Sequence, residues 1–294
     1  MAILPKARKR KRAQRTAAAA RDRLDGVRAE IRELGSVGHP IIAREREGVS
    51  SALVENRRQL GRANAGPEPA VAPFDLDRWV LWQPDRSVPM TELRVGSLRE
   101  SGEGELLGVP CVVPIQPGRS IVIVSRTDRQ RDAARALWQG LVTRLAALAA
   151  GREEVVLLDP AGTSFPQGHR LFTRVVTAVD ISTELDRWRR GLTEARTGWV
   201  VACDVPAGMS HRDAALLLAM VRSAASGTRM IVHVDEDAYR SAAGEPDLGD
   251  DSTRWLLETG DAGLVEDDLG MTVVWDDAPS QALIDLIADR LAAE

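Results

Sequence analysis

The sequence predicts an α/β protein with a mostly parallel sheet covered by helices on both faces, preceded by an N-terminal helical hairpin or coiled coil. Three observations support this fold class. Short runs rich in Val and Ile alternate with longer amphipathic segments over most of the chain. Several runs are apolar at every position, as in strands that are covered on both faces. A heptad-spaced segment stands near the N-terminus.

Residues 1–15 form a basic tip that we expect to be disordered when free, because like charges repel and little apolar surface is present. The tip contains no acid, although the whole chain has a net charge of −4. We predict that its cations contact the phosphates of DNA. These cations are Lys6, Arg8, Lys9, Arg10, Lys11, Arg12 and Arg15. An anionic membrane, an acidic partner and a solvated tail without a ligand are the alternatives.

Residues 16–62 are predicted to form the helical hairpin. Apolar residues from Ala20 to Leu34 recur at heptad spacings, and the Gly- and Pro-containing stretch 35–40 then breaks the helix. A second helix is predicted from about Ile41 to Leu60. Dimerisation through the first helix is the alternative, and it would make the protein a structural oligomer. Residues 63–87 are interpreted as a linker.

The remaining residues, 88–294, are predicted to form the α/β domain. We expect its first two strands to pair antiparallel as a hairpin. The predicted strands are 93–98, 109–115, 120–125, 154–158, 174–179, 199–204, 229–234 and 271–275. The predicted helices are 129–150, 181–192, 211–225 and 280–293.

The composition, with 44% hydrophobic and 28% charged residues, is that of a soluble globular protein. The chain has no run of about 18 apolar residues and no secretory signal, so we expect a cytoplasmic protein. Cys111 and Cys203 lie in apolar runs without a CxxC partner or a nearby histidine cluster. We therefore expect buried, reduced thiols, no disulfide framework and no metal site.

The turn after strand 120–125 has the strand–loop–helix context of a phosphate-binding P-loop, whose pattern is G-x-x-x-x-G-K-[ST]. On that frame Ser125 and Gln130 replace the glycines, Arg131 replaces the lysine and Asp132 replaces the Ser/Thr. Side chains at the glycine positions obstruct the backbone nest, and a carboxylate repels phosphate. All lysines of the chain lie in the basic tip. We expect that ATP and Mg²⁺ binding is lost and that the protein has no cofactor.

Asp159 directly follows the predicted strand 154–158, and Asp204 ends the predicted strand 199–204, as a Walker B strand ends in the Asp that assists Mg²⁺. An Asp followed by Pro and Gly also makes a turn or caps a helix, which is the interpretation that we favour. No catalytic residue is expected. The vestigial nucleotide site comprises Ser125, Gln130, Arg131, Asp132, Asp159 and Asp204.

A second hypothesis is an enzyme, either a nuclease or a nucleotide hydrolase, with a noncanonical carboxylate and histidine site. Strand alternation places His233 and Asp235 on one face. With Asp159 and Asp204 they could bind a metal or transfer protons. This hypothesis requires the four side chains to converge on one pocket.

Several short segments occur in an order that resembles a known family. They are VPMTELRVGSL at 88–98, GVPCVVPI at 108–115, LDPAG at 158–162, DVPAG at 204–208 and WDDAP at 275–279. Their order resembles that in FtsK/SpoIIIE-like proteins of high-GC bacteria, which are hexameric ATP-driven DNA translocases with a RecA-like, P-loop-NTPase-like fold. The resemblance covers most of residues 16–294.

The resemblance assigns the Walker A lysine and Ser/Thr to Arg131 and Asp132, which do not match, and the Walker B Asp to Asp204. It therefore implies the fold and the protein partners of this family, and not its motor activity. We hypothesise a non-catalytic binding or assembly component that acts with an active FtsK-like ATPase or with copies of itself, and with DNA.

Overall fold

The computed structural model describes residues 72–74, 79–84, 90–100, 106–116, 118–150, 152–189, 198–222, 229–248, 253–260, 264–266 and 271–293. All of them belong to one compact unit, which spans residues 57–294. The basic tip and the predicted helical hairpin, 16–62, lie outside the described residues.

The described elements alternate between strands and helices over most of this unit. In chain order they are β1 (Glu92–Glu100), β2 (Leu106–Pro114), β3 (Ser120–Ser125), α3 (Asp128–Ala149), β4 (Glu154–Leu158), the 3₁₀ helix η1 (Pro166–Leu171), β5 (Arg174–Val176), α4 (Ile181–Arg189), β6 (Gly198–Val205), α5 (His211–Arg222), β7 (Arg229–Asp235), α6 (Glu236–Ala243), β8 (Arg254–Glu258), β9 (Leu264–Glu266), β10 (Met271–Trp275) and α7 (Gln281–Ala292). None of the described helices has the length and hydropathy needed to cross a membrane.

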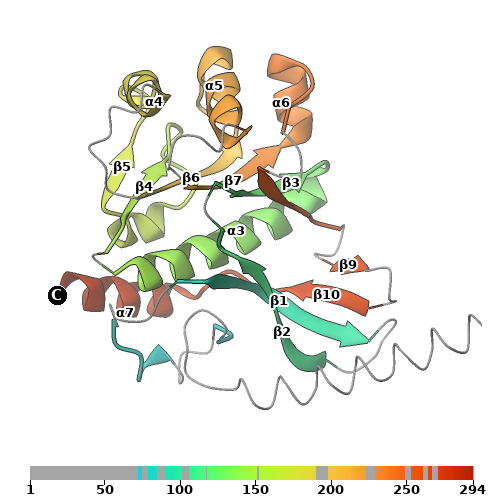
Figure 1. Ribbon diagram of the computed structural model, residues 1–294, viewed down its shortest axis with the longest axis vertical. Coiled ribbons are helices and arrows are strands. Elements are labelled where there is room, and N and C mark those ends of the chain that lie inside the picture. Colours follow the sequence, from blue (N-terminus) through green and yellow to red (C-terminus); the bar gives the residue numbers. More distant parts are fainter. Residues whose placement is uncertain are drawn as a thin grey trace, which may run out of the picture. The chain divides into compact units, whose positions relative to one another are not determined.

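A parallel six-stranded sheet forms the centre of the unit, with the strand order β5-β4-β6-β7-β3-β8 (Figure 1). Every residue of β3 is buried, because helices cover both faces of the sheet. One face packs in a core with α3 and α7, and the other packs with α4, α5 and Tyr239 of α6. These contacts confirm the predicted α/β class with a mostly parallel sheet and helices on both faces.

A second, antiparallel sheet has the order β2-β1-β10-β9 and packs on the other side of α3 (Figure 1). Its β1–β2 pair confirms the predicted hairpin. β10 pairs antiparallel with β1, with Gly96 opposite Trp275. A Cβ on Gly96 would lie 2.2 Å from the Val274 carbonyl oxygen, so this pairing needs a glycine.

The sequence patterns did not predict β8, β9 or α6. β8 has five residues, begins with Arg254 and ends with Glu258, and forms an edge of the parallel sheet, so its apolar run is short. α6 has eight residues and starts directly after β7, with the Asp235 side chain accepting a hydrogen bond from the Ala238 amide at 3.1 Å. Local patterns are weak in elements this short.

Two tryptophans from the predicted linker, 63–87, pack into the same core as α3. The exposed fraction is 2% for Trp79 and 7% for Trp82. The Trp79 indole donates a hydrogen bond to the Pro73 carbonyl at 3.0 Å. The described part of this segment is therefore joined to the α/β unit.

Candidate functional site

The turn between β3 and α3 contains only Arg126 and Thr127, because β3 ends at Ser125 and α3 begins at Asp128. Thr127 has an extended backbone and is the N-cap of α3, since its Oγ1 accepts a hydrogen bond from the Gln130 amide at 3.3 Å. The residues aligned with the interior of a P-loop, 126–129, therefore do not form a wide loop. The last two of them belong to the helix.

The amides of Arg126, Gln130 and Arg131 donate hydrogen bonds to residues of the turn and of the first helical turn. The Arg126 amide donates to Gln130 Oε1 at 2.7 Å, and the Arg131 amide donates to the Thr127 carbonyl at 3.0 Å. A phosphate nest requires amide groups that point at the ligand without another partner. In this turn Gln130 Oε1 and the Thr127 carbonyl accept the hydrogen bonds that a bound anion would accept.

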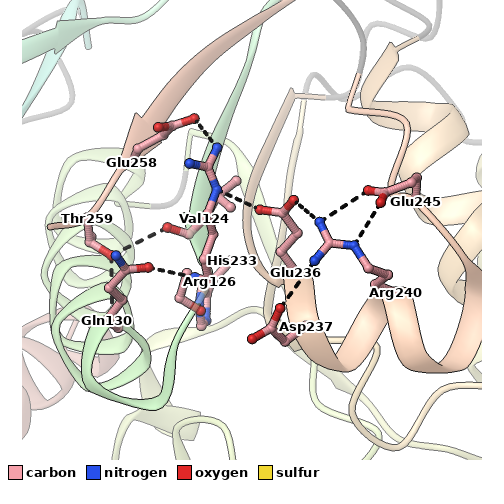
Figure 2. Close-up of polar contacts among 11 residues, drawn as sticks. Val124, Arg126, Gln130, His233, Glu236, Asp237, Arg240, Glu245, Glu258 and Thr259 are labelled. Carbon is pink, nitrogen blue, oxygen red and sulfur yellow. Dashed lines mark hydrogen bonds and ion pairs between the residues drawn. The ribbon is translucent and has the colours of Figure 1, made fainter. Parts of the chain in front are cut away.

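Arg126 lies at the carboxyl edge of the sheet, where it links the ends of two strands that flank β3 (Figure 2). Its guanidinium lies 2.9 Å from Glu236, directly after β7, and 2.9 Å from Glu258, at the end of β8. The hydrogen bond to Glu236 and the charge of Glu258 raise the pKa of Arg126. Figure 2 also shows Arg240 beside Glu236, at 2.7 Å, and next to Glu245. This part of the edge is therefore a connected set of ion pairs.

Arg131, at the position of the Walker A lysine, forms two ion pairs. Its Nε lies 2.7 Å from Oδ2 of Asp235, and its Nη2 lies 3.0 Å from Oδ1 of Asp128. The Asp235 side chain is 9% exposed and the Arg131 side chain is 33% exposed, so this pair is largely shielded from water. Asp132, the next residue, is exposed on the first turns of α3.

Asp204, at the Walker B position, lies between α3 and β7. Its Oδ2 accepts a hydrogen bond from Arg135 of α3 at 2.6 Å, and its Oδ1 lies 3.1 Å from His233 Nδ1. The second contact is within ion-pair distance but is not aligned as a hydrogen bond, so Oδ1 is buried without a hydrogen-bond partner. Burial alone would raise the pKa of Asp204, but His233 and Arg135 lower it to about 2.

His233 is fully buried and contacts the ends of two neighbouring strands. Its Nε2 lies 2.9 Å from Ser125 Oγ on β3, and its Nδ1 lies 3.5 Å from Cys203 Sγ on β6. The Asp204 amide also donates to Nδ1 at 3.3 Å. The side chains of Ser125, Cys203, Asp204 and His233 thus form a polar cluster at the carboxyl ends of three strands.

Asp159, the other Walker B-like residue, closes its own turn after β4. Its Oδ1 accepts hydrogen bonds from the amides of Thr163 at 3.1 Å and Ser164 at 3.2 Å, and its Oδ2 lies 3.1 Å from His169 Nε2. Burial raises the pKa of Asp159, and the hydrogen bonds from Ser164, His169 and Thr163 outweigh it, so that the pKa is lowered. These contacts agree with the turn-forming role favoured from the sequence.

The predicted residues are thus brought together only in part. The contacts place Ser125, Asp204 and His233 in one cluster and join Arg131 to Asp235. Asp159 contacts residues of its own turn, so none of the distances above supports convergence of all four residues of the enzyme hypothesis. The cations of the basic tip lie outside the described residues.

The sequence analysis missed Arg126, Arg135 and Glu258. Arg135 follows Arg131 by one helical turn, so it lies on the same face of α3, and this spacing was a usable signal. No sequence pattern pointed to Glu258 as a site residue, because its strand, β8, was not predicted. The capping of Thr127 was visible in the sequence, since Thr127 and Gln130 match the capping-box spacing S/T-x-x-E/Q.

No protein-family model matches the chain, and no curated protein matches it. Among solved structures, the chain is similar to the cytoplasmic domain of the type VII secretion ATPase EccC of Thermomonospora curvata, with 16% identity over 76% of this chain and 33% of that chain and a TM-score of 0.43. It is also similar to the cytoplasmic domain of EssC, with 9% identity over 69% of this chain and 49% of that chain and a TM-score of 0.41. A third likeness is to the monomer form of the pCW3 conjugation coupling protein TcpA with ATPγS, with 10% identity over 57% of this chain and 54% of that chain and a TM-score of 0.35. The match thus covers between one third and about half of each of these solved chains.

Proposed function

We propose that this chain is a degenerate relative of the FtsK/SpoIIIE-like ATPases that does not hydrolyse ATP and works as a binding or assembly component. The order of its sequence motifs supports this family. The arrangement of the sheet agrees with it, because the turn aligned with Walker A and the carboxylate aligned with Walker B lie at one edge of a parallel sheet. Arg135, four residues after Arg131 on α3, joins the helix to Asp204.

The observation that carries the proposal is the two-residue turn between β3 and α3. A P-loop binds phosphates through unpaired amides at a helix N-terminus. In this chain the amides of Arg126, Gln130 and Arg131 already donate to Gln130 Oε1 or to Thr127. Triphosphate binding would have to break these bonds and unwind the first turn of α3.

The arginines near the turn are also paired with carboxylates. Arg131 would have to leave Asp235, and Arg135 would have to leave Asp204, before either could contact a phosphate. Both arginines are partly exposed, so breaking either pair costs less than about 3–5 kcal/mol, the cost typical of a fully buried pair. The cost still opposes nucleotide binding.

For partners, we propose an active FtsK-like ATPase or a second copy of this chain, together with DNA at the basic tip. A protein partner needs a surface with apolar side chains and accessible backbone. On the described surface, Leu81 and Val179 are 80% and 89% exposed. Val179 follows β5, which is an edge strand of the parallel sheet.

The test is a titration of the full chain with labelled ATP in the presence of Mg²⁺, together with a phosphate-release assay. We expect no saturable binding below about 1 mM, which corresponds to about −4.1 kcal/mol, and no turnover. Micromolar binding with turnover that Arg131→Ala abolishes would refute the proposal. Arg170→Ala is the matched control, because Arg170 is exposed and pairs with Asp289 of α7 instead of with the site.

A further inference from the structure

Cys203 and Asp204 are consecutive residues of β6, and both side chains reach His233 of β7. In a regular strand, consecutive side chains point to opposite faces of the sheet. Asp204 has a φ of 54°, and the pairing of β6 with β7 is irregular between Ala202 and Val205. This local departure from strand geometry puts a thiol, a carboxylate and an imidazole on one side of the sheet.

The three side chains offer ligand atoms that all lie within 4.8 Å of one another. Nδ1 of His233 is 3.5 Å from Cys203 Sγ and 3.1 Å from Asp204 Oδ1. With a zinc–sulfur bond of about 2.3 Å and zinc–nitrogen and zinc–oxygen bonds of about 2.0–2.1 Å, tetrahedral angles put N and S about 3.5 Å apart and N and O about 3.3 Å apart. The two spacings from His233 Nδ1 are thus close to those around one tetrahedral ion.

The Asp204 carboxylate provides an independent sign of a cation at this point. Its Oδ1 is buried without a hydrogen-bond partner, whereas its Oδ2 is held by Arg135. His233 Nδ1 lies 3.1 Å from this Oδ1, and its Nε2 is held 2.9 Å from Ser125 Oγ. A cation between Nδ1 and Oδ1 would give the buried carboxylate oxygen a partner.

We propose that Cys203, Asp204 and His233 bind a divalent metal ion of the Zn²⁺ class. The mixed sulfur, nitrogen and oxygen set suits Zn²⁺ or Co²⁺ and not Mg²⁺, which prefers oxygen ligands. Ser125 and Arg135 orient the histidine and the carboxylate from outside, as metal ligands usually require. Three protein ligands leave a fourth position for water.

Binding changes the protonation of one group. The Cys203 thiol loses its proton to the solvent when the sulfur–metal bond forms, and Asp204 is already a carboxylate. His233 binds through the Nδ1 lone pair, which exchanges its 3.3 Å hydrogen bond from the Asp204 amide for the metal. Burial raises the pKa of Cys203, so the affinity for the metal increases with pH. The sequence did not indicate a metal site that includes Cys203, because Cys203 and His233 are 30 residues apart and show no ligand spacing.

The test uses the full chain and Co²⁺, whose charge-transfer absorption reports a bound thiolate. Cys111 and Cys203 are the two cysteines of the chain, so in Cys111→Ser a thiolate–cobalt band can arise only from Cys203. We expect Cys111→Ser and the wild type to bind one Co²⁺ per chain with this band, and Zn²⁺ to displace it. This comparison leaves the buried Cys203 intact and so does not depend on a variant that fails to fold.

Three variants complete the experiment. Cys203→Ser should lose the charge-transfer band, His233→Gln should bind Co²⁺ at least about tenfold more weakly, and Ser125→Ala should reduce the affinity by about 10–100-fold. Absence of the band in Cys111→Ser at one equivalent of Co²⁺ would overturn the proposal. Persistence of the same band in Cys203→Ser would overturn it as well.

Discussion

Nη2 of Arg144, on α3, lies 2.7 Å from Oδ2 of Asp276, which follows β10. Arg94 of β1 binds the same carboxylate through two hydrogen bonds, at 2.8 and 3.1 Å. The Arg144 guanidinium also stacks over the Phe74 ring, at 3.7 Å from its centroid. Burial lowers the pKa of Arg144 to about 10, and the attraction of Asp276 limits this shift. One carboxylate thus joins the central helix to the antiparallel sheet.

Replacement of this carboxylate should strongly destabilise the fold. In Asp276→Asn, the Arg144 and Arg94 side chains, which are 1% and 7% exposed, keep their charge and lose this carboxylate as a counter-ion. We expect the free energy of unfolding to fall by about 3–5 kcal/mol, measured by urea denaturation. Asp277→Asn changes the exposed neighbour and should stay within about 0.5 kcal/mol of the wild type. Equal losses in both variants would contradict this assignment.

Asp204 should make the stability depend on pH in the acid range. Its pKa is about 2 in the folded chain against 3.8 for the free side chain. Between these two pKa values Asp204 takes up a proton more readily in the unfolded chain than in the folded chain. The stabilisation by the ionised Asp204 is therefore fully present above the pKa of the unfolded chain, and it is lost as the pH falls to the pKa of the folded chain. The loss amounts to about 2 kcal/mol.

The measurement is urea unfolding of the wild type and of Asp204→Asn on both sides of this interval. Other carboxylates contribute in both proteins, so only the difference between the two pH profiles belongs to Asp204. We expect the wild type to lose about 2 kcal/mol more than the variant. Parallel profiles would show that the contacts with Arg135 and His233 do not lower this pKa.

Restoring the Walker side chains alone should not restore nucleotide binding. In the double variant Arg131→Lys, Asp132→Ser, the turn keeps two residues and Thr127 still caps α3. The amides of Arg126, Gln130 and Arg131 remain paired, so we expect no saturable ATP binding below about 1 mM, measured by calorimetry with Mg²⁺. Micromolar binding by this variant would mean that the side chains, and not the backbone, had removed the site.

The basic tip should give DNA binding that depends strongly on salt. Each contacted phosphate contributes about −0.9 to the slope of log K against log salt concentration. Replacement of Lys6, Arg8, Lys9, Arg10, Lys11, Arg12 and Arg15 by glutamine should remove both the affinity and the slope. Fluorescence anisotropy with a labelled duplex at two salt concentrations measures both quantities.

The control for this experiment changes cations outside the basic tip. Arg170 and Arg240 are exposed and already pair with Asp289 and Glu236. Their replacement by glutamine should leave the slope unchanged. A variant without the seven cations that still binds DNA as the wild type does would assign the contact to another surface.

The central strands could be predicted because their signal is local. β3, β4, β6 and β7 each contain a run of at least three apolar residues, and the start of α3 differs from the predicted one by a single residue. β8 was not predicted, because an edge strand of five residues with charged ends can form without a long apolar run. β10 was predicted as a strand, but its antiparallel partner β1 lies far away in the chain.

The sequence predicted which residue types stand at the candidate site, but not which side chains contact each other there. The replacement of the glycines, the lysine and the Ser/Thr by Ser125, Gln130, Arg131 and Asp132 is visible in the sequence. The predicted strand 120–125 and helix 129–150 leave three residues, 126–128, in the turn, whereas Thr127 caps the helix and leaves two. That capping signal is local and was available.

The sequence by itself determined which segments form the main strands and helices and which side chains stand where a phosphate would bind, because both depend on residues close together in the chain. Only the tertiary structure decided that Arg131 meets Asp235, that Arg135 meets Asp204 and that Cys203 meets His233. Those partners belong to different elements, and they meet only once burial of apolar surface over the whole unit has fixed the order of the strands.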